Sequence, residues 1–401
     1  MRYDIGRMHR PFGIGKSVHM VAMNSFGAPA PLLDLNFLSG SLDQRITFSR
    51  TTAATRINAS GYVESMAIDV PRFTYDPSTL EPLGLIVEGA ATNLACGSET
   101  FATSGGVNNW ADTNITRDST NNADPANGTT ALRVTASAGN ATVLNNLSLT
   151  SAARTFSLWL RRVGGTGSIE WTMDGGTTWT AQAITASWDR YSFTATTTAH
   201  VGIRIVTSGD SIELWGAQVE DGQTMTSYIP TVASTVARGR DSAQMLGASF
   251  SSWYNQNEGT FLANWKHASP ERNEFAIAVR ASVSTGLPNS MWIGKQSSAS
   301  AGRQIQYEIR GSGTQRLISG VTVTDSFLRA AGAYRVGGTV GFSYNGISIA
   351  SAAYTQAPVP DRLHIGSFDQ TSATGPINSA ISRIAYWPTR LPDATLQALT
   401  T

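Results

Sequence analysis

Apolar and polar residues alternate with a period of two along most of the chain from residue 32 onward. The clearest alternating runs are residues 156–161, 168–173, 191–196, 201–206 and 212–220. Helical periodicity is absent over any useful length. Asp-Gly-Gly at 174–176 and Asn-Gly at 345–346 are typical hairpin turns. Many short strands separated by turns predict an all-β protein built from tandem β-sandwiches.

The same pattern divides the chain into four parts. Residues 1–31 are basic, irregular and broken by glycines, and we expect an anchoring arm there. A flexible terminus without a role in attachment is the alternative. Residues 32–98 predict a small N-terminal β domain, and residues 99–241 predict a jelly roll. Residues 242–401 predict a second sandwich that ends in a short helix beginning at Asp393.

Composition excludes several classes of function. Charged residues make up 14% of the 401 residues, against a usual ~25%, and the formal net charge is +1. This gives no argument for binding to nucleic acid or to an anionic membrane surface. The apolar run at residues 18–23 is too short for a signal peptide, and no run reaches the ~18 apolar residues of a membrane span. We therefore expect synthesis in the cytoplasm and no membrane insertion.

Catalytic signatures are missing from the sequence. There is no His-Glu-x-x-His, no Gly-x-Ser-x-Gly and no phosphate-binding loop. The five histidines never fall in metal-ligand spacing. The single cysteine, Cys96, allows no internal disulfide and is expected to be a small buried hydrophobe. The sequence therefore predicts no catalytic residues, no cofactor and no enzymatic activity.

Two groups of motifs, in order along the chain, carry a resemblance to a known class of protein. The upstream motifs are FSR at 48–50, PRFTYD at 71–76 and GLIVEGAATNL at 84–94. The downstream motifs are WGAQVE at 215–220 and SYIPT at 227–231, followed by Arg238 and Asp241. Together they resemble tail and capsid appendage proteins of bacteriophages, whose jelly rolls look like carbohydrate-binding modules. The end of the chain, with a glycine, a long strand and a short helix, is similar to concanavalin-A-like and laminin-G-like sandwiches.

Charged residues inside these motifs have two possible roles. We expect Arg50, Arg72, Asp76 and Glu88 to form ion pairs that hold loops in place, the alternative being a catalytic carboxylate pair. Because modules of the resembled class often hold a structural calcium ion, Asp241 is a weak candidate ligand. A surface carboxylate or a salt bridge from Asp241 to Arg238 is the other possibility, since no full set of 6–8 oxygen ligands can be assembled.

Aromatic residues are the main candidates for glycan binding, because sugar rings stack their apolar faces on Trp or Tyr. Trp171 and Trp179 flank one predicted hairpin with Asp174 at its tip, so these three residues form the candidate site. Trp159 and Trp215 lie within alternating strands and are expected in the core. In the second sandwich Trp265, Trp292 and Tyr307 are further candidates.

The resemblance implies a virion structural protein that binds host-surface glycan. Its expected partners are other virion proteins, the glycan and further copies of itself, as a homotrimer. Two alternatives stay open: a decoration or adaptor protein that binds no glycan, and a glycan depolymerase.

Overall fold

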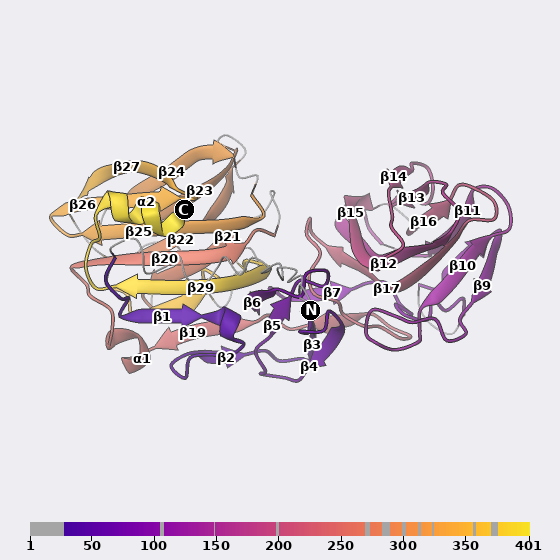
Figure 1. Ribbon diagram of the computed structural model, residues 1–401, viewed down its shortest axis with the longest axis horizontal. Helices are drawn as coiled ribbons and strands as arrows, with labels where there is room; N and C mark the ends of the chain where they lie inside the picture. The colour runs from indigo at the N-terminus through magenta and orange to yellow at the C-terminus, as the bar shows by residue number, and fades with distance from the viewer. Residues whose placement is uncertain are drawn as a thin grey trace, which may run out of the picture.

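The structure is a computed structural model that describes residues 28–104, 108–147, 149–197, 200–268, 273–282, 289–298, 302–311, 314–322, 325–355, 358–369 and 376–401. Antiparallel sheets make up most of it, and the helices in these ranges are short: α1 (Ala248–Ser251), α2 (Asp393–Thr400) and a 3-10 turn (Phe37–Ser39). Figure 1 shows two β-sandwiches side by side. The predicted all-β architecture of tandem sandwiches is confirmed.

The first sandwich consists of two five-stranded sheets. One has the order β15 (Asp189–Thr197), β12 (Ala152–Gly164), β17 (Ser211–Asp221), β10 (Leu132–Ala136) and β9 (Ile115–Asp118). The other has the order β14 (Thr180–Gln182), β13 (Ile169–Thr172), β16 (Val201–Ile205), β11 (Ala141–Asn145) and β8 (Trp110–Thr113). Alternate residues of the facing strands, such as Phe156, Leu158 and Leu160, fill the core between the sheets.

The second sandwich is larger. One sheet has the order β27 (Ile347–Tyr354), β26 (Gly338–Tyr344), β25 (Phe327–Arg335), β20 (Glu258–Lys266), β29 (Ser379–Trp387), β6 (Pro82–Val87) and β5 (Phe73–Tyr75), and β1 (Leu33–Asn36) also pairs with β29. The facing sheet has the order β2 (Thr47–Ser49), β19 (Ser242–Leu246), β28 (Arg362–Ile365), β21 (Glu274–Arg280), β22 (Ser290–Ser298), β23 (Gly302–Arg310) and β24 (Thr314–Thr322). The predicted C-terminal helix is present as α2, with Leu396 and Leu399 buried against the sheet.

The expected separate domain at residues 32–98 is not seen. Strands β1 and β6 pair directly with β29, and β2 pairs with β19, so the early strands complete the second sandwich. Leu33, Leu85 and Val87 belong to the same core as residues of the last strands. Strands of three to six residues cannot close a core of their own and gain stability by joining a larger sheet.

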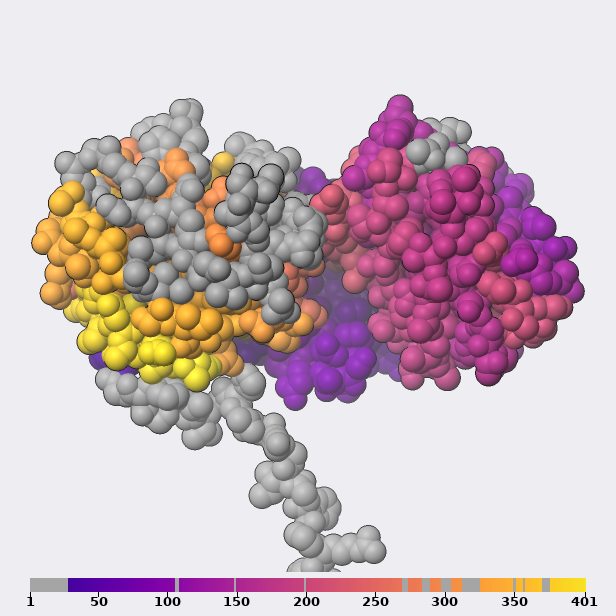
Figure 2. All heavy atoms as spheres, turned by 90° about the horizontal axis from the view of Figure 1, so that it is seen from above, coloured from indigo at the N-terminus to yellow at the C-terminus, as the bar shows by residue number. Residues whose placement is uncertain are grey.

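Two early elements do not enter that sandwich. The hairpin of β3 (Ala54–Ile57) and β4 (Val63–Met66) lies between the two sandwiches, and β7 (Ala91–Asn93) pairs with β18 (Val236–Arg238). In Figure 2 the two sandwiches form separate lobes, with residues from early in the chain between them. The first sandwich is therefore inserted in the chain between the two parts that form the second sandwich.

The predicted arm at residues 1–31 falls mostly outside the described residues. Two of its last four residues contact the second sandwich. Ala28 packs beside the small apolar cluster under α2. The indole Nε1 of Trp387 donates a hydrogen bond to the carbonyl oxygen of Pro29 at 2.6 Å. The part of the arm that the structure describes is thus fixed to the last strand of the chain.

Candidate functional site

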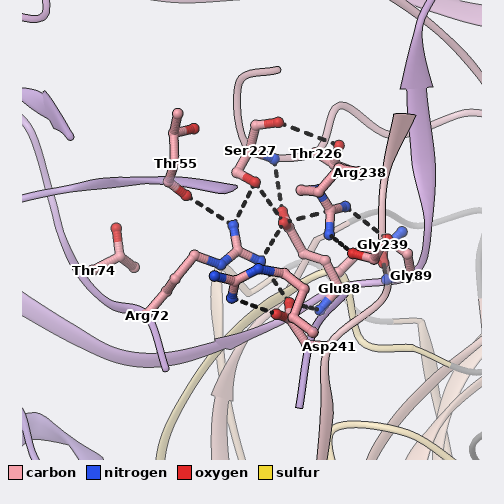
Figure 3. Close-up of polar contacts among 12 residues, drawn as sticks. Thr55, Arg72, Thr74, Glu88, Gly89, Thr226, Ser227, Arg238, Gly239 and Asp241 are labelled. Carbon is pink, nitrogen blue, oxygen red and sulfur yellow. Dashed lines mark hydrogen bonds and ion pairs between the residues drawn. The ribbon is translucent and has the colours of Figure 1, made fainter. Parts of the chain in front are cut away.

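Five charged side chains meet in the interior where the two sandwiches join. They are Arg50, Arg72, Glu88, Arg238 and Asp241, here called the junction cluster, and each is at least 95% buried. Figure 3 shows Arg72, Glu88, Arg238 and Asp241 pointing toward one another. All five come from the motifs that carry the sequence resemblance. Residues almost two hundred positions apart in the chain are therefore neighbours in space.

Arg72 is at the centre of the cluster. Its Nη2 donates to Glu88 Oε2 at 2.8 Å and to Asp241 Oδ2 at 2.5 Å. Its Nη1 donates to the carbonyl oxygen of Thr55 at 2.8 Å and to Ser227 Oγ at 2.5 Å. One guanidinium group therefore connects the β3–β4 hairpin, Glu88 directly after β6, and both ends of residues 227–241, here called the exit segment, which follow β17.

Asp241 is surrounded by positive charge and hydrogen-bond donors. Its Oδ1 accepts from Arg50 Nη1 at 3.1 Å, and its Oδ2 accepts from the backbone amide of Glu88 at 2.9 Å as well as from Arg72. Two guanidinium groups on one carboxylate do not fit a calcium site, so Asp241 is not a plausible metal ligand. Nor is it a surface carboxylate paired with Arg238, because Arg238 contacts Glu88 Oε2 at 3.4 Å instead.

Glu88 stays ionised although it is buried. Burial by itself would raise the pKa of Glu88, but Arg238 and Arg72, together with hydrogen bonds from Ser227, lower this pKa to about 2. Ser227 donates its amide to Oε1 at 2.7 Å and its hydroxyl to Oε2 at 2.6 Å. The charge is thus held by fixed partners on every side.

The expected structural role of Arg50, Arg72 and Glu88 is confirmed. Glu88 and Asp241 are sealed by arginines away from solvent, so they cannot serve as a catalytic acid and base. Asp76, grouped with them from the sequence, lies elsewhere: its Oδ1 accepts from the amides of Ser78 at 2.9 Å and Thr79 at 3.0 Å and so closes a turn.

Amide side chains extend the junction toward the first sandwich. Asn93 donates to the carbonyl oxygens of Ala217 and Ile229 at 2.9 and 2.8 Å and accepts from the amide of Val219 at 3.0 Å. Gln218 accepts from the amide of Ile229 at 2.7 Å. Both side chains tie β17 to the exit segment that follows it, which explains why these motif positions are Asn and Gln.

In the hairpin predicted as the glycan site, Trp171 is buried, whereas Asp174 and Trp179 are partly exposed. Trp171 is 1% exposed and packs edge-on against Phe156 at 4.9 Å between ring centroids, so it cannot stack on a sugar. Asp174 accepts hydrogen bonds from Thr172 Oγ1 at 2.9 Å and Thr178 Oγ1 at 2.6 Å and holds the turn. Trp179 is half-buried, and one of its faces carries the guanidinium of Arg204 at 4.4 Å.

Most other tryptophans are buried as well. Trp159 and Trp215 pack against each other and against Tyr228, confirming the expectation that they are core residues. The further candidates in the second sandwich, Trp265, Trp292 and Tyr307, are each at most 2% exposed. None of these rings is available as a stacking platform.

A pocket of about 310 Å³ opens beside this aromatic cluster, between the β3–β4 hairpin and the first sandwich. Its walls include Val63 and Ser65 of the hairpin, Pro230 of the exit segment, and two carboxylates, Glu99 and Asp124. Glu99 was not predicted from the sequence, because it lies in an irregular segment before the first sandwich with no motif around it. The pocket is formed by segments that only the fold brings together.

Other kinds of site are not found in the described ranges. No three His, Cys, Asp or Glu side chains there are grouped so that they could hold a metal ion. None of the helices described has the length and apolar content needed to span a bilayer.

Comparison with known proteins gives distant structural likenesses. No protein-family model matches the chain, and no curated sequence matches it. The carbohydrate-binding module CBM40 of a Ruminococcus gnavus sialidase, bound to α2,3-sialyllactose, is 15% identical, with a TM-score of 0.31, over 37% of this chain and 84% of that one. Domain 4 of the Geobacillus stearothermophilus arabinanase AbnA, in complex with arabinotriose, is 11% identical, with a TM-score of 0.29, over 45% and 84% of the two chains. A heptameric pentraxin from Limulus polyphemus is 10% identical, with a TM-score of 0.28, over 37% and 73%. At such identities and TM-scores these likenesses carry no argument about what this chain binds.

Proposed function

We propose that the protein is a structural component of a bacteriophage particle, a tail or head appendage, that binds host-surface glycan through its β-sandwiches. The observation that carries this proposal is the junction cluster. Motifs that resemble phage appendage proteins, scattered from residue 48 to residue 241, meet in one buried network. Motifs that matched by chance would not be expected to lie together in the folded protein. Their convergence therefore supports a resemblance that extends over both sandwiches.

The junction also supplies a mechanical reason for the arrangement. A glycan-binding appendage has to hold its binding face at a fixed position relative to the part that is anchored to the particle. Charged pairs buried between the sandwiches, with fixed hydrogen-bond geometry, specify one relative orientation. Binding at a single site is then expected to be weak, about 4 kcal/mol for a millimolar Kd. Several linked copies would raise the avidity by about 10²–10⁴.

The proposed assembly is a homotrimer, which would shield edge strands of the sandwiches and give three copies of each site. Light scattering at micromolar concentration is expected to give three times the mass of the 42.6 kDa chain. A monomer mass across that range would contradict the trimer.

Three measurements test the function as a whole. Immunogold labelling with antibody to this protein is expected to mark intact particles, and the full-length protein is expected to bind a subset of a glycan array. A protein found on the particle that binds no glycan would instead be a decoration or adaptor protein. The release of reducing sugar from host capsule or lipopolysaccharide would favour a depolymerase, an activity that we do not expect.

A further inference from the structure

A pocket beside the β3–β4 hairpin adjoins the aromatic cluster of Trp159, Trp215 and Tyr228. Its volume, about 310 Å³, is at the lower end of the ~300–1,000 Å³ typical of ligand sites and fits one small ring-sized ligand. It lies between two structural units, because the amide of Val63 in the hairpin donates to the carbonyl oxygen of Pro125 in the first sandwich at 2.9 Å. Ligand sites are commonly found at such boundaries.

Glu99 supplies an available acceptor in this pocket. Its Oε1 accepts a hydrogen bond from the hydroxyl of Tyr228 at 3.1 Å. Its Oε2 has no hydrogen-bond partner among the described residues, and the side chain is half-buried. Burial, with a smaller contribution from Asp124, raises the pKa of Glu99. Partial removal from water strengthens any hydrogen bond that a ligand would donate to this carboxylate.

The other polar atoms of the pocket are mostly engaged already. Asp124 accepts from the amides of Ala126 and Gly128, each at 2.8 Å, and from the amide and hydroxyl of Thr130, each at 2.9 Å. Thr130 also accepts from Trp215 Nε1 at 2.9 Å. Glu99 and the exposed hydroxyl of Ser65 on the rim are therefore the groups left for a ligand.

The charge of the pocket restricts the ligand further. Two carboxyl groups, those of Glu99 and Asp124, lie in its wall, and no Lys, Arg or His lines it. Arg190 stacks on Trp159 at 4.5 Å in the adjoining aromatic cluster, but it donates to Thr226 and Ser157 and does not line the pocket. A ligand with its own carboxylate would be repelled without compensation. A ligand with several hydroxyl donors and an apolar face fits the carboxylate and the wall of Val63 and Pro230.

We infer that this pocket binds a neutral hexose unit, with Glu99 accepting hydrogen bonds from its hydroxyl groups, and that it rejects sialic and uronic acids. This inference rests on the proposed function and names the class of sugar and the residue that reads it. Glu99 would determine which class of sugar binds, and Ser65 would lie at the mouth of the pocket.

The experiment uses the full-length protein and defined probes. Saturation-transfer NMR and calorimetry would compare the methyl glycosides of glucose, galactose, mannose and rhamnose with N-acetylneuraminic acid and glucuronic acid. We expect at least one neutral glycoside to bind with millimolar affinity and both acids to bind at least about tenfold more weakly. Glu99→Gln, which keeps the shape but removes the charge, is expected to weaken binding about tenfold, the loss of one charge-assisted hydrogen bond.

Two further variants complete the test. Ser65→Trp, at an exposed rim position, is expected to abolish binding by filling the mouth while the fold is kept. Glu81→Gln, the same substitution at an exposed carboxylate outside the pocket, is expected to change nothing. Equal binding of the acidic sugars, or unchanged binding in both Glu99→Gln and Ser65→Trp, would overturn the inference. If glycan-array binding persists in those variants, the proposed function stands without this site. If no form of the protein binds any glycan, both proposals fail.

Discussion

Asp241 accepts hydrogen bonds from two arginines in a place that water does not reach. Removing one member of a buried ion network leaves the others desolvated and unpaired, which typically costs about 3–5 kcal/mol. An exposed ion pair contributes far less, about 0–1 kcal/mol. Removing a buried carboxylate therefore lowers stability far more than removing an exposed one.

Asp241→Asn is expected to lower the free energy of unfolding by about 3 kcal/mol or more, because Arg50 and Arg72 would lose their shared negative charge. Urea denaturation measures this change. The matched control is Asp221→Asn, since Asp221 pairs with Arg154 but its side chain is 74% exposed. If both variants lost the same small amount, the junction cluster would not hold the sandwiches together.

The lowered pKa of Glu88 predicts how the stability of the protein depends on pH. Its pKa is about 2 in the folded protein, against an ordinary value of 4.5. A lowered folded-state pKa stabilises the fold above pH 4.5, and this contribution, about 3 kcal/mol, is lost as the pH falls toward 2. Denaturation at several pH values should show wild type losing stability across this window more steeply than Glu88→Gln. Parallel curves for the two proteins would contradict the assignment.

Sequence alone could predict that the motif charges form ion pairs, but not which charges pair. Arg72 and Asp241 are 169 residues apart, and that contact follows from the fold. The prediction that Trp171 stacks on a sugar was wrong, although the local sequence already indicated a buried position. Ile169 and Met173 lie two residues to either side of it, so alternation already placed Trp171 on an apolar face. Hairpin context favoured a surface residue, whereas the period of two favoured the core, and the core was correct.

Among the strands, β17 contains the most informative irregularity. Its pairing with β12 shifts between Trp159 and Ser157, so Gly216 and Ala217 lie opposite a single residue of β12. Before this bulge Ile212 and Leu214 face the core, and after it Ala217 and Val219 do. An unbroken alternation would have placed Gln218 in the core instead. The bulge therefore places Gln218 on the same outer face as Trp215, outside the sandwich core.

Gly216→Ala is expected to destabilise the first sandwich by about 1–3 kcal/mol or more. Gly216 has a φ of +67°, and an added Cβ would lie 2.7 Å from Cε3 of Trp159. Gly209→Ala is the control, because Gly209 also has a positive φ, +86°, but open space around it. Thermal unfolding should rank Gly216→Ala clearly below Gly209→Ala, and near-ultraviolet circular dichroism should report disturbed tryptophan packing. Equal losses in both variants would mean that only backbone conformation matters.

Strands with regular alternation or a strong turn were predicted well from the sequence. Asn345 and Gly346 both have positive φ, as the predicted two-residue hairpin between β26 and β27 requires. Strands β21 and β25 were not predicted. Both are apolar on consecutive positions because they are buried on both faces, so the period of two that identifies a strand is lost.

At the scale of the whole molecule, the sequence could predict two sandwiches but not that the chain returns to the second one. The pairing of β1 and β6 with β29 joins segments about three hundred residues apart. No local pattern records such a pairing. For the same reason, a fragment beginning at residue 99 lacks strands that the second sandwich needs, and binding studies require the full chain.

On the proposal that the protein belongs to a phage particle, deletion of residues 1–27 is expected to prevent incorporation into particles and to leave the thermal stability unchanged. The cut keeps Ala28 and Pro29, which contact the second sandwich. A longer deletion through residue 36 also removes β1 and should destabilise the protein, which separates folding from attachment. Truncated protein present on particles at the normal level would contradict the role of the arm.

The position of β29 has a consequence for how the protein is made. Emerging from the ribosome, the first sandwich has all its strands by residue 221, about 160 residues before β29 appears. Strands β1, β6 and β20 all pair with β29. Until β29 has been synthesised, the edges of these strands that it covers stay unpaired. A premature stop codon that removed as little as the final tenth of the message would leave the early strands without their partner. Chaperones would therefore be needed while the second sandwich is still incomplete.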